Sequence, residues 1–453
     1  MAERILLLQG PVGPFFRRFA AELASAGCEV FKINFNGGDA ACFRGPNAVD
    51  FRGRPGEWRG FLQDFVRSRQ IDRIYVFGDT RAHHRIARDV ARELGIRFFV
   101  FEEGYLRPDF VTLEEGGVNG ESSLPRDPDF YRWQDAETLA PRRVGNVFGR
   151  TAWHATVYYI ATTLLHRRFP HYRHHRRTAL VPEALAWLRS LARRLAHRGS
   201  DRALLRALLD GHSKRFFLVP LQVHCDAQVV VHSPFCDVSE FIETVARSFA
   251  RNAPADRVLV FKHHPLDRAY RDYGALLGSL AAELGLGDRL RYAHDLHLPT
   301  LLRHAEGVVT VNSTAGASAL LHGVPTKVLG DAVYDLPGLT SQCPLDAFWA
   351  SPEAVDRDLY RRFSAYVRRS VLANGSFYRA LPGVASPSGI CWVSTQHLPH
   401  SLRFALGTQH GVRVQPRPAV ATPARPRTTA DAVARPSGAE VPAAARRAAG
   451  RAS

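Results

Sequence analysis

Strand-like and helix-like hydrophobic patterns alternate along the first hundred residues of the chain. Short apolar runs typical of buried strands occupy residues 5–8, 30–33, 74–77 and 97–101. Between them, apolar side chains recur at the i, i+3, i+4 spacing of a helix over residues 16–23, 58–65 and 82–94. This alternation predicts a parallel sheet with helices on both faces.

The same alternation returns in the second half of the chain. Predicted strands occupy residues 216–221, 258–261, 307–311 and 326–329, with helical patterns between them. The pattern loosens between about 105 and 210, which we interpret as a helical insert. We therefore predict an α/β protein with a GT-B-like architecture, in which two Rossmann-like domains face a central cleft. We predict a first domain with its insert at residues 1–210 and a second domain at residues 211–350. Closing helices follow at 351–383, and a tail at 384–453.

The predicted tail differs from the rest in composition. Residues 416–453 consist mainly of alanine, proline and arginine and show no apolar periodicity. Such a composition cannot build a core, and we predict that residues 384–453 are a disordered, low-complexity segment.

The chain has 453 residues and a formal net charge of +17, from 60 lysines and arginines against 43 acidic residues. The predicted tail supplies +7 of this charge, and we interpret the remaining +10 as spread along the chain. The excess favours an anionic partner, but no helix-turn-helix, zinc or RNA-recognition signature is present, so we do not expect nucleic acid. Without a signal peptide or a long apolar run, and with six scattered cysteines, the chain is predicted to be cytoplasmic with reduced thiols.

Candidate chemistry lies where predicted strands end, because ligands of open α/β sheets bind beyond the carboxyl ends of the strands. After residues 97–101 come Glu102 and Glu103. Two neighbouring carboxylates can raise each other's pKa and supply an acid or a base. The alternative is a loop in which these acids cap a helix or pair with Arg107.

A second polar segment, with Gln222 and Asp226, follows the strand at 216–221. The Asp226 carboxylate suits a nucleophile, a base or a ligand of sugar hydroxyls. The competing interpretation is a helix N-cap.

Lys262, His263, His264 and Pro265 form the third segment, after residues 258–261. Ammonium and imidazole donors suit a phosphate or a nucleotide base. Neighbouring residues of an extended chain point to opposite sides, so we predict that at most one of the two histidines faces a given site and that they form no metal pair.

The fourth segment, Asn312-Ser313-Thr314, begins a predicted helix after residues 307–311. Its hydroxyls and backbone N–H groups can bind an anion. The alternative is plain capping of the helix by Asn312 or Ser313.

Together, these four segments resemble the capsule polysaccharide biosynthesis/export family over roughly residues 1–380. The chain is similar to its single-unit KpsS/LipB type, a retaining β-Kdo transferase, where Kdo is an acidic octulosonic sugar. The resemblance implies a GT-B fold and CMP-Kdo as the donor substrate. It also implies a phosphatidylglycerol-type acceptor on which a short poly-Kdo linker begins, at the inner face of the cytoplasmic membrane, with other capsule assembly and export proteins as partners. No DxD-type motif follows a predicted strand, so we expect no metal, and we expect no cofactor.

The resemblance also implies roles for individual residues. Asp226 would be the nucleophile, and Glu103, or its neighbour Glu102, would transfer the acceptor proton. His264 would bind the departing phosphate. The remaining predicted binding residues are Gln222, His263, Pro265, Asn312, Ser313, Thr314, Arg107 and Lys262.

Two other functions stay open at this point: a non-catalytic capsule export or scaffold protein that only binds polysaccharide, and a transferase for another nucleotide sugar such as CMP-sialic acid. The stretch Trp153–Arg177 also has two interpretations. It could dock on anionic lipid through its aromatic and basic residues, or it could be an insert whose aromatic side chains are core.

Overall fold

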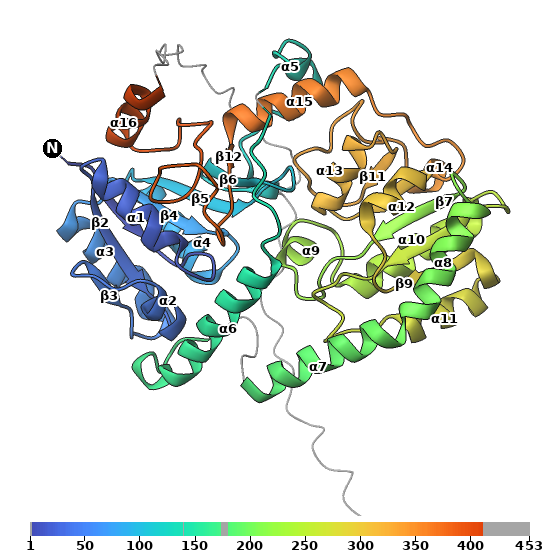
Figure 1. Ribbon diagram of the computed structural model, residues 1–453, viewed down its shortest axis with the longest axis horizontal. Helices are drawn as coiled ribbons and strands as arrows, with labels where there is room; N and C mark the ends of the chain where they lie inside the picture. Colours follow the sequence, from blue (N-terminus) through green and yellow to red (C-terminus); the bar gives the residue numbers. More distant parts are fainter. Residues whose placement is uncertain (1, 139, 174–179, 411–453) are drawn as a thin grey trace, which may run out of the picture.

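The computed structural model describes residues 2–138, 140–173 and 180–410 and shows two α/β domains side by side (Figure 1). The first domain contains a seven-stranded sheet in the order β12-β6-β5-β4-β1-β2-β3. Its strands are β1 (Arg4–Leu7), β2 (Glu29–Asn34), β3 (Ala48–Asp50), β4 (Arg73–Phe77), β5 (Arg97–Glu103), β6 (Phe110–Glu115) and β12 (Leu372–Asn374). The first five strands run parallel, as the alternating pattern predicted, whereas β6 and β12 pair antiparallel.

Helices cover both faces of this sheet. Those of the first hundred residues are α1 (Phe15–Ser25), α2 (Gly37–Cys42), α3 (Trp58–Arg69) and α4 (Ala82–Glu93). The helix α1 packs its phenylalanines against Ile5 and Leu7 on one face. On the other face, α3 and α4 bury apolar side chains against Leu6 and Ile33. The strands alternate their side chains between these two cores, which is why their sequences are almost continuously apolar.

The insert is helical only in part. It begins with the strand β6 and continues through α5 (Pro128–Arg132), α6 (Phe148–Leu164), α7 (Leu180–Ala196) and α8 (Arg198–Asp210). The last of these helices packs Leu208 into the core of the second domain. Asp201 of α8 also accepts the backbone N–H groups of His294 and Asp295, at 3.0 and 2.7 Å. Thus α8 joins the second domain, although the sequence placed it in the first.

The second domain contains a five-stranded, wholly parallel sheet in the order β11-β10-β7-β8-β9. Its strands are β7 (Phe216–Pro220), β8 (Val258–Lys262), β9 (Leu290–Ala293), β10 (Gly307–Thr310) and β11 (Thr326–Val328). Its helices are α9 (Ala227–Val231), α10 (Val238–Asn252), α11 (Gly274–Glu283), α12 (Leu298–His304), α13 (Thr314–Leu321) and α14 (Leu345–Phe348). This alternation matches the sequence pattern, and the predicted pair of α/β domains is confirmed.

After the second domain the chain returns to the first. The helix α15 (Arg357–Ser370) crosses above both domains, and β12 then pairs with β6 (Figure 1). Residues 384–410 also fold onto the first domain, where Trp392 and Leu402 are buried beside α1 and α16 (His400–His410) follows. The prediction that the tail begins at residue 384 is therefore wrong for residues 384–410, because isolated apolar side chains there fill a core without any periodicity. The remainder of the predicted tail, 411–453, lies outside the described residues.

Two further expectations can be compared with the structure. All six cysteines are free thiols, as predicted. Within the part of the chain that the structure describes, no helix combines the length and the apolar character needed to cross a lipid bilayer.

We expect Trp392→Ala to lower the free energy of unfolding by about 3–5 kcal/mol, the usual cost of removing a large buried aromatic side chain. The Trp392 ring packs near Phe19, and its Nε1 donates to Glu22 at 2.9 Å. Urea unfolding of the purified variant measures the loss. Val393→Ala, at a neighbouring side chain that is 43% exposed, is the matched control. A loss no larger than that of the control would contradict the assignment of residues 384–410 to the first domain.

Candidate functional site

A cavity of about 500 Å³ lies between the two domains, at the carboxyl ends of their strands. Both domains line it, and nine of the twelve residues predicted from the sequence are in its wall: Glu102, Glu103, Arg107, Gln222, Asp226, His264, Asn312, Ser313 and Thr314. Four segments that are far apart in the sequence therefore meet in one place. The wall also contains residues that the sequence did not single out, namely Phe77, Gly78, Thr80, Arg81, Asn119, Val223 and Cys225.

The carboxylate pair ends the strand β5 on the first-domain side of this cleft. Burial raises the pKa of Glu102 to about 7, and the negative charges of Glu103 and Asp79 act in the same direction. The backbone N–H of Glu103 donates to Glu102 at 2.9 Å and opposes this shift. Glu103 accepts a hydrogen bond of 3.1 Å from the hydroxyl of Tyr378. The predicted acid/base pair is thus two carboxyl groups in different surroundings, one of which titrates near neutral pH.

Gln222 links two other predicted residues on the opposite side of the cleft. Its amide nitrogen donates to Asp226 at 3.2 Å and to Asn312 at 3.0 Å, while its oxygen accepts the backbone N–H of Asn312 at 3.3 Å. Gln222 is buried, at 7% exposure, so this geometry is protected from competition with water. The amide therefore holds the Asp226 carboxylate in a defined orientation at the cleft.

The two adjacent histidines point in different directions, as the pleat of an extended chain predicts. His264 lines the cleft, and its Nδ1 accepts the backbone N–H of Leu266 at 3.2 Å. The proton of the neutral ring is therefore on Nε2. His263 instead lies in the core, 2% exposed, with Nδ1 2.6 Å from the Tyr292 hydroxyl. Burial lowers the pKa of His263 to about 4.

Three residues that the sequence analysis placed in the binding site lie outside the cavity wall: Lys262, His263 and Pro265. The Lys262 side chain turns into the second domain, where its Nζ donates to the carbonyl of His263 at 3.3 Å, and burial lowers its pKa. Pro265 is exposed beside the cleft. Lys262 and His263 are therefore structural, since a strand end carries side chains to the core as well as to the ligand side, and Pro265 is not part of the cavity wall.

A histidine–aspartate pair next to the site escaped the sequence analysis. His224 lies two residues before Asp226, and its Nδ1 is within hydrogen-bonding distance of the Asp267 carboxylate. The Asp267 carboxylate is fully buried and also accepts the backbone N–H of His224 at 3.2 Å. This contact ties the Asp226 loop to the loop after His264. The partners are 43 residues apart, which is why no local motif revealed them.

The helix α13 places its N-terminus at the cleft. Ser313 is its N-cap, because the Ser313 hydroxyl accepts the backbone N–H of Ala315 at 3.2 Å. The capping interpretation of Ser313 is therefore correct, and it is compatible with anion binding because the hydroxyl can still donate its own proton. The carbonyl of Ser313 accepts a hydrogen bond from the Tyr334 hydroxyl. A Cβ at Gly316 would lie 2.2 Å from that hydroxyl, so this turn of the helix requires glycine.

Two arginines supply positive charge to the cleft. Arg107 was predicted from the sequence, and Arg81 was not. Arg81 lies at the N-terminus of α4, with its guanidinium 5.7 Å from the centre of the Phe77 ring. A lone arginine after a strand carries no motif, so only the fold could place it here.

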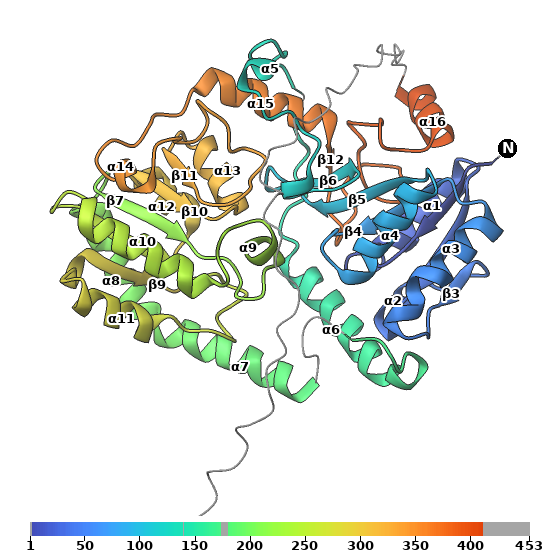
Figure 2. The ribbon, with the colours of Figure 1, turned by 180° about the vertical axis from the view of Figure 1, so that it is seen from behind.

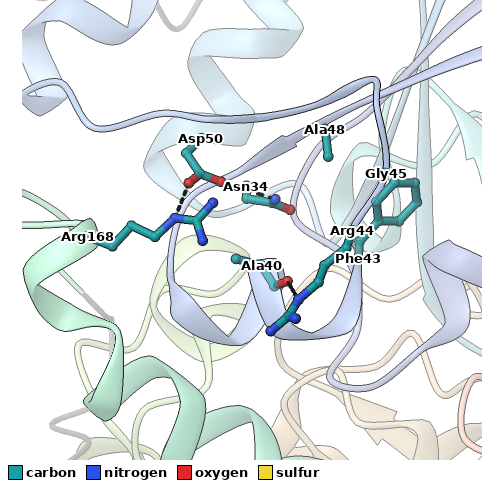
Figure 3. Close-up of a pocket in the computed structure, with 8 residues that line it drawn as sticks. All are labelled: Asn34, Ala40, Phe43, Arg44, Gly45, Ala48, Asp50 and Arg168. Atoms are coloured by element: carbon teal, nitrogen blue, oxygen red, sulfur yellow. Dashed lines mark hydrogen bonds and ion pairs between the residues drawn. The ribbon is translucent and has the colours of Figure 1, made fainter.

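A second, more open cavity of about 340 Å³ lies at the far edge of the first sheet (Figure 3). Its charged side chains are already engaged: Arg168 pairs with Asp50, and Arg44 donates to the carbonyl of Ala40 at 3.3 Å. Asn34 donates to Asp50 at 3.3 Å, while its Oδ1 has no hydrogen-bond partner among the described residues. None of the predicted site residues lines it. We therefore assign the candidate active site to the cleft between the domains.

Metal binding was tested by geometry. Among residues 2–138, 140–173 and 180–410, no group of three His, Cys, Asp or Glu side chains is arranged to hold an ion. Independence of metal stays a prediction that needs an activity measurement.

The family model and the sequence relatives identify one family. The family model described as "Capsule polysaccharide biosynthesis protein" matches residues 72–378. The chain is 43% identical to "Capsule polysaccharide export protein KpsS" of Escherichia coli over 385 residues, covering 83% of this chain and 97% of that protein. It is 41% identical to "Capsule polysaccharide modification protein LipB" of Neisseria meningitidis serogroup B, covering 83% of this chain and 92% of that protein. A solved structure, "Thermosulfurimonas dismutans KpsC, beta Kdo 2,7 transferase", aligns at 14% identity and a TM-score of 0.39, over 82% of this chain and 92% of that one.

We expect one glutamate carboxyl resonance to titrate with a midpoint near pH 7 and to disappear in Glu102→Gln, because burial raises this pKa from its usual 4.5. Between these two values the folded state binds more protons than the unfolded state, so stability falls as pH rises from about 4.5 to 7. Carbon-detected NMR of the carboxyl groups measures the midpoint, and urea unfolding at several pH values measures the slope. A Glu102 midpoint near 4.5, or a pH slope unchanged in the variant, would contradict the assignment.

Proposed function

Because the chain belongs to the capsule polysaccharide biosynthesis protein family, we propose that it is a glycosyltransferase that moves Kdo from CMP-Kdo to a phosphatidylglycerol-type lipid. The transfer would start the poly-Kdo linker of a capsular polysaccharide. The observation that carries the proposal is the cleft, in which a carboxylate held by an amide lies in one domain and a pair of acids lies in the other. This is the equipment for nucleophilic attack and proton transfer at one sugar carbon.

In the first step, the Asp226 carboxylate attacks the anomeric carbon of Kdo. The bond between that carbon and the phosphate oxygen breaks, and CMP leaves with the electron pair. The product is a Kdo ester of Asp226, with inverted configuration. Gln222 supports this step, since its N–H donates to Asp226 and fixes the orientation of the carboxylate.

CMP departure requires stabilisation of negative charge on the phosphate. His264 is suited to this role because its Nδ1 accepts the backbone N–H of Leu266, which leaves Nε2 as the nitrogen that can donate to the phosphate. The N-terminus of α13 adds backbone N–H groups and the hydroxyls of Ser313 and Thr314. Arg81 and Arg107 provide positive charge for the sugar carboxylate or the phosphate.

In the second step, a hydroxyl of the acceptor attacks the same carbon, and Asp226 leaves as a carboxylate. A base takes the hydroxyl proton, and a second inversion gives net retention. The pKa of about 7 favours Glu102 for this proton, because a base that titrates near the working pH transfers protons most effectively. Glu103, held by Tyr378, would then position the acceptor.

The lipid acceptor would place the protein on the inner face of the cytoplasmic membrane, beside other capsule assembly and export proteins. The donor sugar is the narrower part of the proposal, since CMP-sialic acid carries the same nucleotide and also a carboxylate. Product analysis with each donor distinguishes them.

We expect Asp226→Asn to abolish transfer, by at least about 10³-fold, because an amide cannot form the covalent intermediate. Mass spectrometry of the lipid product after incubation with CMP-Kdo and phosphatidylglycerol measures transfer. Cys225→Ala, which changes the exposed neighbouring side chain in the same cleft, is the control and should keep near-normal activity. Full turnover in Asp226→Asn would refute the nucleophile, and no CMP release by wild-type protein would favour a non-catalytic export role.

We also expect transfer to continue unchanged in an excess of EDTA, because the proposed stabilisation of the leaving phosphate comes from His264, the arginines and the α13 N-terminus. The same product assay measures this after dialysis against chelator. Loss of activity that Mg²⁺ or Mn²⁺ restores would show that a divalent ion, and not these groups, bears the phosphate charge.

A further inference from the structure

The helices α6 and α7 run along one edge of the molecule, below the two domains in Figure 1, and they contact each other. The reversed view in Figure 2 shows the same arrangement. One helix lies against the first domain and the other against the second. Both present apolar side chains to solvent, which is unusual for helices of a globular protein.

The apolar stripe of α6 follows helical spacing. Trp153, Val157, Ile160 and Leu164 recur at intervals of four, three and four residues, and their exposures range from 37% to 71%. They therefore form one continuous stripe along the helix. A stripe of this kind on an isolated surface helix exposes apolar area to water that a rotation of the helix could bury.

Rotation of α6 is prevented by contacts of its opposite side. Tyr158 is buried, and its hydroxyl donates to Asp39 at 2.9 Å and accepts from Gln9 and Asn36 at 2.9 and 2.8 Å. The helix also approaches α2 so closely that a Cβ at Gly38 would lie 2.6 Å from the Tyr158 ring. Because the hydrogen bonds of Tyr158 hold one side of α6 against the first domain, the apolar stripe on the opposite side stays exposed to solvent.

The helix α7 also places its polar side chains toward the protein and its apolar side chains toward solvent. Its arginines face the second domain: Arg193 donates to the carbonyls of Arg268 and Arg271, at 2.7 and 3.0 Å, and Arg189 donates to that of Ala269 at 3.3 Å. Its leucines face away from the protein. Leu188, Leu191 and Leu195 are 63%, 52% and 59% exposed. An amphipathic helix normally buries leucine and exposes arginine, so the outward face of α7 is built for an apolar environment.

The net charge of this part of the chain indicates which apolar environment the outward faces of α6 and α7 contact. Residues 148–210 contain twelve arginines and three acidic residues, a net charge of +9 out of +17 for the whole chain. The basic excess outside the tail is therefore concentrated here, which corrects the sequence interpretation that it is spread along the chain. Exposed tryptophans also belong to the surface, Trp153 on α6 and Trp187 on α7. Three arginines are exposed near the ends of the two helices: Arg150, Arg167 and Arg198. Apolar stripes and tryptophans with basic residues at the helix ends match the interface of an anionic bilayer better than a protein or nucleic-acid surface.

We propose that the outward faces of α6 and α7 form one docking surface, defined by Trp153, Val157, Ile160, Leu164, Trp187, Leu188, Leu191 and Leu195, and that it binds the surface of an anionic phospholipid bilayer. The proposal rests on the proposed function in one respect, since a lipid acceptor requires the cleft to be held at a membrane. It adds the surface that does so. The sequence analysis left two interpretations of Trp153–Arg177 open. The proposal adopts membrane docking and extends the docking surface to α7.

The docking surface is connected to both sides of the cleft through intermediate residues. The carbonyls bound by Arg189 and Arg193 belong to the loop after His264, and Asp267 of that loop binds His224 beside Asp226. On the other side, Tyr158 of α6 accepts a hydrogen bond from Gln9, and the carbonyl of Gln9 accepts the backbone N–H of Phe77 in the cleft wall at 3.1 Å. Docking would therefore fix donor-side and acceptor-side loops against the same bilayer.

Vesicle flotation tests the surface without any sugar donor. We compare wild-type protein, a triple variant with Leu188→Gln, Leu191→Gln and Leu195→Gln, and a control triple variant with Leu321→Gln, Val393→Gln and Phe404→Gln. The control residues are also exposed and apolar, at 51%, 43% and 69%, but belong to other surfaces. The neutral vesicles contain phosphatidylcholine alone, and the anionic vesicles contain in addition about 30 mol% phosphatidylglycerol.

We expect wild-type and control proteins to float with the anionic vesicles and the α7 variant to bind at least about tenfold more weakly. Binding should weaken with salt and be poor on neutral vesicles. Equal binding by the α7 variant and wild type would overturn the proposal. So would a wild-type dimer in size-exclusion chromatography that dissociates in the α7 variant without vesicle binding, or binding to duplex DNA in preference to vesicles.

Transfer assays separate a failure of docking from a failure of the proposed function. With dispersed short-chain phosphatidylglycerol, the α7 variant should transfer Kdo as wild type does, whereas with vesicles it should lose at least about tenfold. Asp226→Asn should bind vesicles normally and transfer to neither acceptor. Transfer by wild type without selective loss in the α7 variant would refute the docking surface and leave the enzyme assignment standing.

Discussion

The pairing of β12 with β6 is the contact on which the geometry of the cleft depends. Through it the chain, having built the second domain, closes back onto the first sheet. Asn374 of β12 is buried, and its side-chain amide bonds the backbone of Asp109 and Arg142, at distances of 2.7 to 3.0 Å. Four residues later the same segment delivers Tyr378 to Glu103. A short antiparallel strand thus both fastens the domains together and supplies part of the site.

A shared apolar core makes that closure rigid. Side chains of the first domain, such as Tyr105 and Tyr131, belong to the same buried cluster as Tyr334, Leu336 and Phe363 of the second half. Domains joined by a polar interface move freely, whereas a continuous hydrophobic core resists separation. The distance between the acid pair and Asp226 is therefore set by core packing, and the site can be preorganised for the two successive attacks proposed above.

The sequence predicted the parallel parts of this structure well and the closing parts poorly, for identifiable reasons. Parallel strands buried on both faces are continuous apolar runs, which any window detects. The strand β6 breaks that pattern because Glu114 is fully buried in it, accepting hydrogen bonds from Tyr105 and Ser122. With only three residues, β12 has no period to detect.

The residues of the site also fall into those that the sequence predicted and those that it did not. Each predicted segment followed a strand end, and the parallel sheets brought all four segments together. Side-chain direction was predictable only where the pleat decides it, as for His263 and His264. Tyr378 and Asp267 act on residues 275 and 43 positions away, so their roles depend on tertiary contacts that a single sequence does not encode locally.

The net charge of +17 does not show where the positive charge lies, but its distribution along the chain does. The cleft wall carries two arginines against Glu102, Glu103 and Asp226, so it is not a basic funnel even though the proposed donor is an anion. With a pKa of about 7, Glu102 is partly protonated near neutral pH, which reduces the negative charge of the wall. Selection of the proposed donor would then depend on the hydrogen-bonding groups of His264 and α13. Most of the remaining positive charge lies in residues 148–210, away from the chemistry. The proposed attraction to an anionic surface and the proposed recognition of an anionic sugar therefore rest on different parts of the chain, so substitutions can test one without altering the other.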